Sequence, residues 1–151
     1  MTLRDLPAED LLYGLYDNRH IQKAVDRVIK AKAVILATPV YKAAYTGFLK
    51  TFLDLLPSDA LHGKIVIPIA VGGTLAHLLT IDYALKPVLN ALGARYTYSG
   101  VYILDSQIAR EGSNVRIEDQ IKHRIDKTVE QLVVEFRQQI HPIFQTRGEQ
   151  R

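Results

Sequence analysis

Two short loops carry residue types that could hold a flat ligand. Thr38–Lys42 follows the apolar run Ala33–Ala37, and Val71–Thr74, which contains two glycines, closes the apolar run Ile65–Val71. Glycine lets backbone N–H groups approach a ligand closely, and Tyr41 offers a ring that can pack against an aromatic heterocycle. Such a pair of loops suits a planar cofactor contacted mainly by backbone. Two ordinary turns are the competing interpretation, because a Gly-Gly pair after a strand is a weak signal by itself.

The two apolar runs predict the strands that would position these loops. Ala33–Ala37 is short and rich in β-branched residues, which is typical of a strand buried on both faces. Ile65–Val71 contains Pro68, which argues against a regular central strand, but its neighbours are too apolar for a loop. In a parallel sheet both strands end at the same edge, where open α/β sheets bind their ligands.

The remaining pattern alternates helices and strands. We expect a third strand over Tyr98–Leu104, followed by a polar loop over Asp105–Ser113. Helical spacing of apolar residues predicts a short turn carrying Leu11 and Leu12, and then a helix capped by Asp17 or Asn18. The apolar face of this helix is expected to carry Ile21, Val25, Val28 and Ile29. The same spacing predicts three further helices, over Phe48–Leu56, Leu75–Leu92 and Ile117–Phe136. Pro87 predicts a break at or just before it, and Gly93 suits the C′ position. This alternation predicts an α/β fold, a parallel sheet with helices on both faces.

Composition narrows the class of protein. The 151 residues are 48% hydrophobic, which suits one domain over residues 1–151, with 142–151 as a frayed tail. We expect a cytoplasmic protein that binds neither membrane nor nucleic acid, since no apolar run is long enough to span a bilayer and the net charge of +3 comes from scattered residues. There is no cysteine, and the histidines lack ligand spacing, so no metal site is expected. These are His20, His62, His123 and His141.

Two long strings carry a family resemblance. ATPVYKAAYTGFLKTFLDLLP and GKIVIPIAVGGTLAHLLTIDYALKPVL resemble the NAD(P)H-dependent FMN reductase family, from about Asp5 to Gln107. More narrowly, they are similar to the reductase component of two-component alkanesulfonate monooxygenases. The resemblance implies a flavodoxin-like fold and hydride transfer from NADPH or NADH to FMN. It also implies that reduced flavin passes to a partner monooxygenase in sulfonate sulfur assimilation.

The resemblance also assigns residues. It places one loop beside the flavin ring, a second loop on the flavin side, and one inserted tyrosine in a π-bulge at the interface of a homo-oligomer. The loop beside the flavin ring comprises Pro39, Val40, Tyr41 and Lys42. The second loop comprises Gly72, Gly73 and Thr74, and the inserted tyrosine is Tyr83. A core tyrosine is the competing interpretation of Tyr83. No catalytic acid or base is expected, because the flavin itself takes the hydride, so His77 is interpreted as a helix-start residue.

The chain departs from the family pattern at its start. Members begin with a strand, a Gly/Ser/Arg loop that binds the FMN phosphate, and a helix, whereas Thr2–Tyr13 matches the segment after the family's second strand. We therefore expect a domain incomplete at the N-terminus, three parallel strands, and Ala33–Ala37 as a sheet edge. Such a chain should bind FMN and riboflavin weakly and with similar affinity. The alternatives are a quinone or azo reductase on the same fold, and a flavin-free binding or assembly module.

Overall fold

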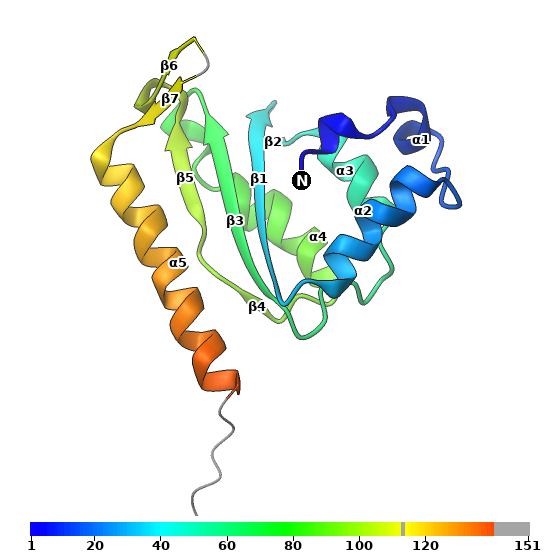
Figure 1. The fold of residues 1–151 in the computed structure, drawn as a ribbon. Coiled ribbons are helices and arrows are strands. Elements are labelled where there is room, and N and C mark those ends of the chain that lie inside the picture. Colours follow the sequence, from blue (N-terminus) through cyan, green and yellow to red (C-terminus); the bar gives the residue numbers. More distant parts are fainter. Residues whose placement is uncertain (113, 141–151) are drawn as a thin grey trace, which may run out of the picture. The chain divides into compact units, whose positions relative to one another are not determined.

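The computed structural model describes residues 1–112 and 114–140 of the chain (Figure 1). It divides into two compact units, Met1–Arg116 and Ile117–Arg151, and each is described by itself. The expected frayed tail, 142–151, lies outside the described residues. The expectation of a single domain over 1–151 stays a prediction.

A mostly parallel sheet forms the centre of the first unit. Among the described residues it has five strands in the order β2-β1-β3-β4, with β5 also pairing with β3. Strands β1 (Ala33–Tyr41) and β3 (Ile65–Gly72) run parallel over their shared length. Strands β4 (Tyr96–Thr97) and β5 (Val101–Leu104) pair in parallel with the other side of β3, and the short β2 (Ala44–Tyr45) is antiparallel to β1. The predicted α/β class with a parallel sheet is confirmed.

Strand β3 is central even though it contains Pro68. The pairing register moves by one residue across the proline, from Val66 opposite Thr97 to Ile69 opposite Val101. Pro68 has no N–H to donate to the hydrogen-bond ladder of the sheet. The segment paired with β3 is therefore interrupted opposite Pro68, between β4 and β5, and carries one extra residue there. Gly100 occupies the break with φ 88°, and a Cβ on it would lie 2.7 Å from the Pro68 carbonyl oxygen. The predicted strand over Tyr98–Leu104 therefore forms only from Val101, as β5, and the preceding short strand β4 lies before the predicted range.

Three helices pack on one face of the sheet in this unit, and two short helical turns lie near its N-terminus (Figure 1). The bounds are η1 (Leu3–Asp5), α1 (Ala8–Leu12), α2 (Arg19–Lys30), α3 (Gly47–Asp54) and α4 (Lys86–Ala91). Asn18 caps α2, its side chain accepting from the His20 N–H over 2.9 Å, as one of the two predicted caps. Ile29 does not share the buried face of α2, contrary to the expectation, and is exposed.

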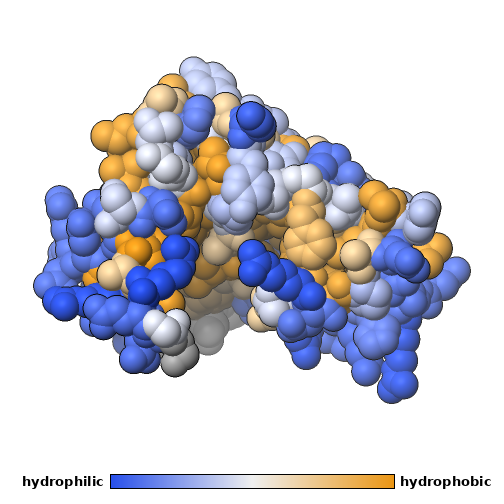
Figure 2. All heavy atoms as spheres, turned by 90° about the horizontal axis from the view of Figure 1, so that it is seen from above, coloured by the Kyte–Doolittle hydropathy of each residue, from blue (hydrophilic) through white to orange (hydrophobic). Residues whose placement is uncertain are grey.

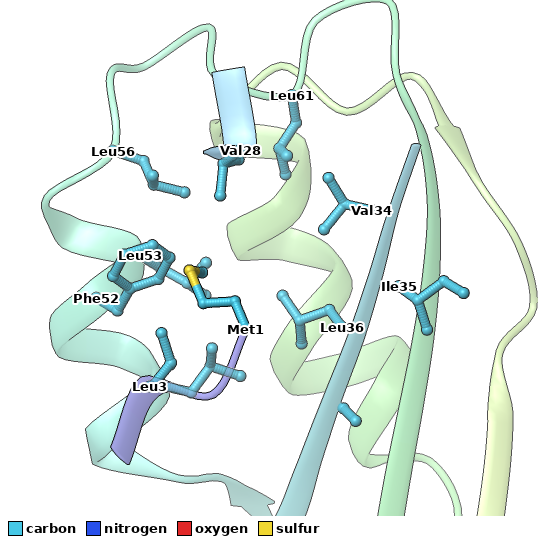
Figure 3. A pocket seen from close by; sticks show the side chains of 12 residues that line it. Met1, Leu3, Val28, Val34, Ile35, Leu36, Phe52, Leu53, Leu56 and Leu61 are labelled. Carbon is cyan, nitrogen blue, oxygen red and sulfur yellow. The ribbon is translucent and has the colours of Figure 1, made fainter. Parts of the chain in front are cut away.

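Strand β1 is an edge, but it is not buried on both faces as predicted. Among the described strands only β2 pairs with its second side, at Val40 and Tyr41. Figure 3 shows Val34 and Leu36 pointing toward α3 while Ile35 points away; Leu36 is 9% exposed and Ile35 is 52% exposed. The apolar run therefore follows the alternation of a strand with one covered face.

An apolar cavity of about 120 Å³ lies beneath the inner face of β1 (Figure 3). Side chains of β1, α2 and α3 line it, and Met1 and Leu3 from the start of the chain reach into it. The core of the first unit thus extends up to the unpaired edge of the sheet.

The predicted break near Pro87 is confirmed as a π-helix. The segment after β3 forms a 3₁₀ turn, η2 (Leu75–His77), then the π-helix η3 (Ile81–Leu85), then α4 with Pro87 in its first turn. Gly93 follows α4 with φ 86°, which agrees with the predicted C′ position.

The predicted polar loop after the third strand is wrong. The segment forms a 3₁₀ turn, η4 (Asp105–Gln107), and a two-stranded sheet of β6 (Ile108–Glu111) and β7 (Asn114–Ile117). The second unit is the helix α5, which runs over Asp119–Ile140 rather than starting at Ile117. No helix in the described part of the chain is long and apolar enough to cross a membrane.

Candidate functional site

An open cleft of about 540 Å³ lies at the carboxyl ends of β1 and β3. Figure 2 looks onto this end of the strands and shows hydrophilic and hydrophobic residues mixed on the surface. Five of the seven residues predicted to bind a cofactor line the cleft: Pro39, Val40, Tyr41, Gly72 and Gly73. The structure thus brings together the two loops that the sequence singled out. Lys42 and Thr74 are not among the lining residues; Lys42 lies in the turn after β1, and Thr74 lies at the start of η2.

Lys42 belongs to a tight turn between β1 and β2. Tyr41 pairs with Ala44, so the turn has two central residues, Lys42 and Ala43, with φ of 51° and 60°. Positive φ at both positions defines the turn that suits a two-residue hairpin, but glycine or asparagine usually occupies it. A Cβ at positive φ costs about 1–2 kcal/mol per residue. The hairpin that carries Tyr41 into the cleft therefore stores strain.

Two buried hydroxyl groups hold this hairpin. The Thr38 hydroxyl accepts a hydrogen bond from the Thr46 N–H over 3.3 Å and donates to the Pro39 carbonyl over 2.9 Å. The Thr80 hydroxyl donates to the Ala43 carbonyl over 3.2 Å. Both threonines are buried, so each hydroxyl replaces its water partner with a partner in the hairpin.

The second loop depends on Tyr102, which sequence reasoning did not identify. A Cβ on Gly72 would lie 2.0 Å from the Tyr102 hydroxyl oxygen, so glycine is required here by the tyrosine rather than by a ligand. That hydroxyl donates to the Thr74 carbonyl over 2.7 Å, and burial raises the pKa of Tyr102, which keeps the donor protonated. Thr74 also starts η2, where its hydroxyl accepts from the Ala76 N–H over 3.3 Å. No pattern in the sequence links Tyr102 to the loop.

Of the two glycines in the second loop, Gly73 faces open space. A Cβ placed on it meets no atom within 4 Å, and its loop borders the cleft. The exposed ring of Tyr41 lies on the opposite loop. The space beside Gly73 is therefore free of protein atoms, and the binding of a flat ligand there stays a prediction.

The cleft also contains charged residues that were not predicted as site residues. Arg4, Asp105 and Arg110 line it, and an Arg110 guanidinium nitrogen lies 3.4 Å from an Asp105 carboxylate oxygen. Both side chains of this pair are exposed. Sequence reasoning placed Asp105 at this edge but interpreted it as part of a solvated loop. The β6–β7 hairpin that brings Arg110 here was missed, although Glu111-Gly112-Ser113-Asn114 is a turn-forming run.

Tyr83 lies in the π-helix, as the resemblance implied, and it is 79% exposed. The competing interpretation of a core tyrosine is therefore wrong. Exposed apolar residues precede it on η2 and the segment that follows: Leu75, Leu78 and Leu79.

The mostly parallel sheet with its flanking helices is a flavodoxin-like fold, and comparison with known proteins gives the family. Residues 1–109 match the model of the NADPH-dependent FMN reductase family. The chain belongs to this family. It is therefore an oxidoreductase whose family uses NAD(P)H and FMN, and the expected cofactors are confirmed at that level.

Individual relatives support the same assignment. The chain is 46% identical over 143 residues to an FMN reductase (NADPH) of Pseudomonas putida, covering 93% of this chain and 73% of the relative. It is 46% identical over 129 residues to an FMN reductase (NADPH) of Escherichia coli, covering 85% and 68%. The solved structure of an NADH:FMN oxidoreductase in its apo form matches with a TM-score of 0.78 and 36% identity, over 89% of this chain and 70% of that one.

Proposed function

We propose that the cleft between the Pro39–Lys42 and Gly72–Thr74 loops is the flavin site of this FMN reductase, where a nicotinamide nucleotide reduces FMN. The observation that carries the proposal is the convergence of both loops on one cleft at the ends of adjacent parallel strands. Its volume falls within the range of about 300–1,000 Å³ that small-molecule sites occupy.

The residues of the chain bind and orient in this proposal, and none donates or removes a proton. FMN, when bound, supplies the centre that accepts the hydride. Tyr41 packs against a ring system, the backbone at Gly73 allows close approach, and Pro39 and Val40 form the wall of the cleft on the β1 side. Arg4 and Arg110 give the cleft positive charge that suits a phosphorylated nucleotide.

Substitution of Gly73 tests the site. Because Gly73 faces open space and lacks positive φ, Gly73→Leu should fold normally and place its side chain in the cleft. Gly47 also has open space around it and lies at the start of α3, so Gly47→Leu is the matched control. We expect Gly73→Leu to weaken FMN binding at least about tenfold, equivalent to about 1.4 kcal/mol, measured by flavin fluorescence. Wild-type affinity in Gly73→Leu would contradict the proposed site.

We further propose that the chain acts in the cytoplasm as a homo-oligomer that supplies reduced flavin to a partner monooxygenase in sulfonate sulfur assimilation. The support is the π-helix at Ile81–Leu85 with Tyr83 exposed on it, the feature that the sequence shares with the sulfonate subgroup. Deleting Tyr83 should restore regular helical register and shift the assembly to smaller oligomers in sedimentation. An unchanged oligomer size would contradict the interface role.

Acceptor choice distinguishes flavin supply from a quinone or azo reductase on the same fold. NADPH oxidation is followed with free FMN, with a quinone, and with both omitted. Turnover that depends on added FMN and saturates with it supports flavin supply. Turnover with the quinone that exceeds turnover with FMN would favour the alternative.

A further inference from the structure

A side-chain hydrogen bond joins the turn at the cleft to the residue that precedes the π-helix. The Thr80 hydroxyl donates to the Ala43 carbonyl across 37 residues of sequence, over 3.2 Å. Thr80 is 5% exposed, whereas Ala43 is exposed in the turn. Because a buried hydroxyl without a partner is unfavourable, the pairing restrains the position of the turn as well as that of Thr80.

This turn needs a restraint. Lys42 and Ala43 both carry a Cβ and both have positive φ, a conformation that residues other than glycine rarely adopt. The conformation sets where β2 pairs with β1 and where the ring of Tyr41 projects. A turn that relaxed to negative φ would move Tyr41, which lines the cleft.

Apolar packing joins the same two segments. Ile81, the residue after Thr80, is buried in a small cluster with Ala70 and Tyr102, and Val40 of β1 packs against this cluster. Tyr102 in turn donates to the Thr74 carbonyl of the second loop. The start of the π-helix and Val40 on the β1 side of the cleft therefore share one apolar cluster, in addition to the Thr80–Ala43 hydrogen bond.

We propose that Thr80 is a positioning residue for the flavin: its hydrogen bond to Ala43 keeps the Lys42–Ala43 turn left-handed and so keeps Tyr41 at the cleft. The inference rests on the proposed flavin site. It also links that site to the π-helix, since Thr80 immediately precedes the π-helix. A neighbouring molecule that shifts the π-helix would thereby change the geometry of the flavin site.

Removal of the hydroxyl tests the role. Thr80→Val keeps the shape of the side chain and loses the donor, and Thr80→Ser keeps the donor. At the usual strength of one hydrogen bond, we expect Thr80→Val to raise the Kd and the KM for FMN about fivefold. Its kcat at saturating FMN and its KM for NADPH should be unchanged. For Thr80→Ser, the Kd and the KM for FMN should stay within about twofold of the wild-type values. Thr51→Val is the control, because it removes a hydroxyl that donates to the Phe48 carbonyl within α3.

A second substitution separates positioning from general damage to the core. Glycine adopts positive φ without a restraint, so Ala43→Gly combined with Thr80→Val should restore FMN affinity to within about twofold of wild type. A loss caused by disturbed packing around Thr80 would persist in the double variant, and that result would overturn the inference.

Tyr41→Ala distinguishes the failure of this inference from failure of the site. If Tyr41→Ala weakens FMN binding and Thr80→Val does not, the inference is wrong and the flavin site stands. If neither variant weakens FMN binding, the proposed site is wrong and the inference falls with it.

Discussion

At the scale of single residues, the sequence identifies the cleft loops but not the residues that hold them. Pro39, Tyr41 and Gly73 were predictable because they follow buried strands and have the backbone or ring properties that a flat ligand needs. Tyr102 and Thr80 were not, since their roles depend on side-chain hydrogen bonds to Thr74 and Ala43, which lie far away in the sequence. Gly72 is predicted to bind the cofactor, which stays a prediction; it lines the cleft, and the close contact with Tyr102 explains why the residue is glycine.

Tyr102→Phe isolates the hydrogen bond that supports the second loop. We expect the variant to lose about 1 kcal/mol of unfolding free energy near pH 8, the usual net value of one hydrogen bond. Burial raises the pKa of Tyr102 above its ordinary value of 10.0. The protonated form is thus favoured in the folded state, so this contribution is complete below pH 10.0 and is lost as pH rises through the higher folded-state pKa.

The measurement is urea unfolding of wild type and Tyr102→Phe at about pH 8 and about pH 11, on either side of the ordinary tyrosine pKa. Other titrating groups affect both proteins alike, so the difference between them reports Tyr102. A difference that does not shrink at the higher pH would show that Tyr102 does not ionise in this range or that its proton is not what stabilises the loop.

At the scale of elements, periodicity predicted the strands and helices that carry strong patterns. β3 was predictable despite Pro68, because its apolar run outweighs the one missing backbone N–H donor. The interruption at Gly100 between β4 and β5 was not predictable, since it depends on how this segment pairs with β3. The β6–β7 hairpin was missed because its strands are short and largely polar. β1 shows the limit of an apolar run as evidence, because the uninterrupted run predicts two buried faces whereas Leu36 is buried and Ile35 is exposed.

Paired lysine substitutions on β1 test which face is buried. Leu36 points toward α3 and Ile35 away from it (Figure 3). Leu36→Lys should cost at least about 3 kcal/mol, since a lysine there is buried without a partner, whereas Ile35→Lys should change the unfolding free energy by less than about 1 kcal/mol, as surface substitutions do. Thermal or urea unfolding of both variants decides. Equal destabilisation by the two would mean that both faces of β1 are buried in solution.

At the scale of the whole molecule, the parallel sheet places the cleft at the carboxyl ends of β1 and β3, and among the described strands only the short β2 pairs with the other side of β1. The sequence predicted both features, because strand order follows from the alternation of strands and helices and from the family resemblance. It did not predict the charge at the ligand edge. The chain carries a net charge of +3, and Arg4 and Arg110 belong to the lining of the cleft.

This charge limits how well the chain distinguishes FMN from riboflavin, which differ by a phosphate. Arg110 is exposed and already paired with Asp105, and exposed ion pairs contribute about 0–1 kcal/mol. We therefore expect FMN to bind no more than about fivefold tighter than riboflavin at low salt. The preference should disappear near 1 M salt, where screening acts within about 3 Å. Arg110→Ala should remove most of it, and Arg116→Ala, on β7 outside the cleft lining, should not. The measurement is fluorescence titration of both flavins against the wild type, Arg110→Ala and Arg116→Ala. A preference for FMN above about a hundredfold that is insensitive to salt and to Arg110→Ala would contradict this expectation. It would require a buried phosphate site, because only a desolvated contact supplies that much free energy.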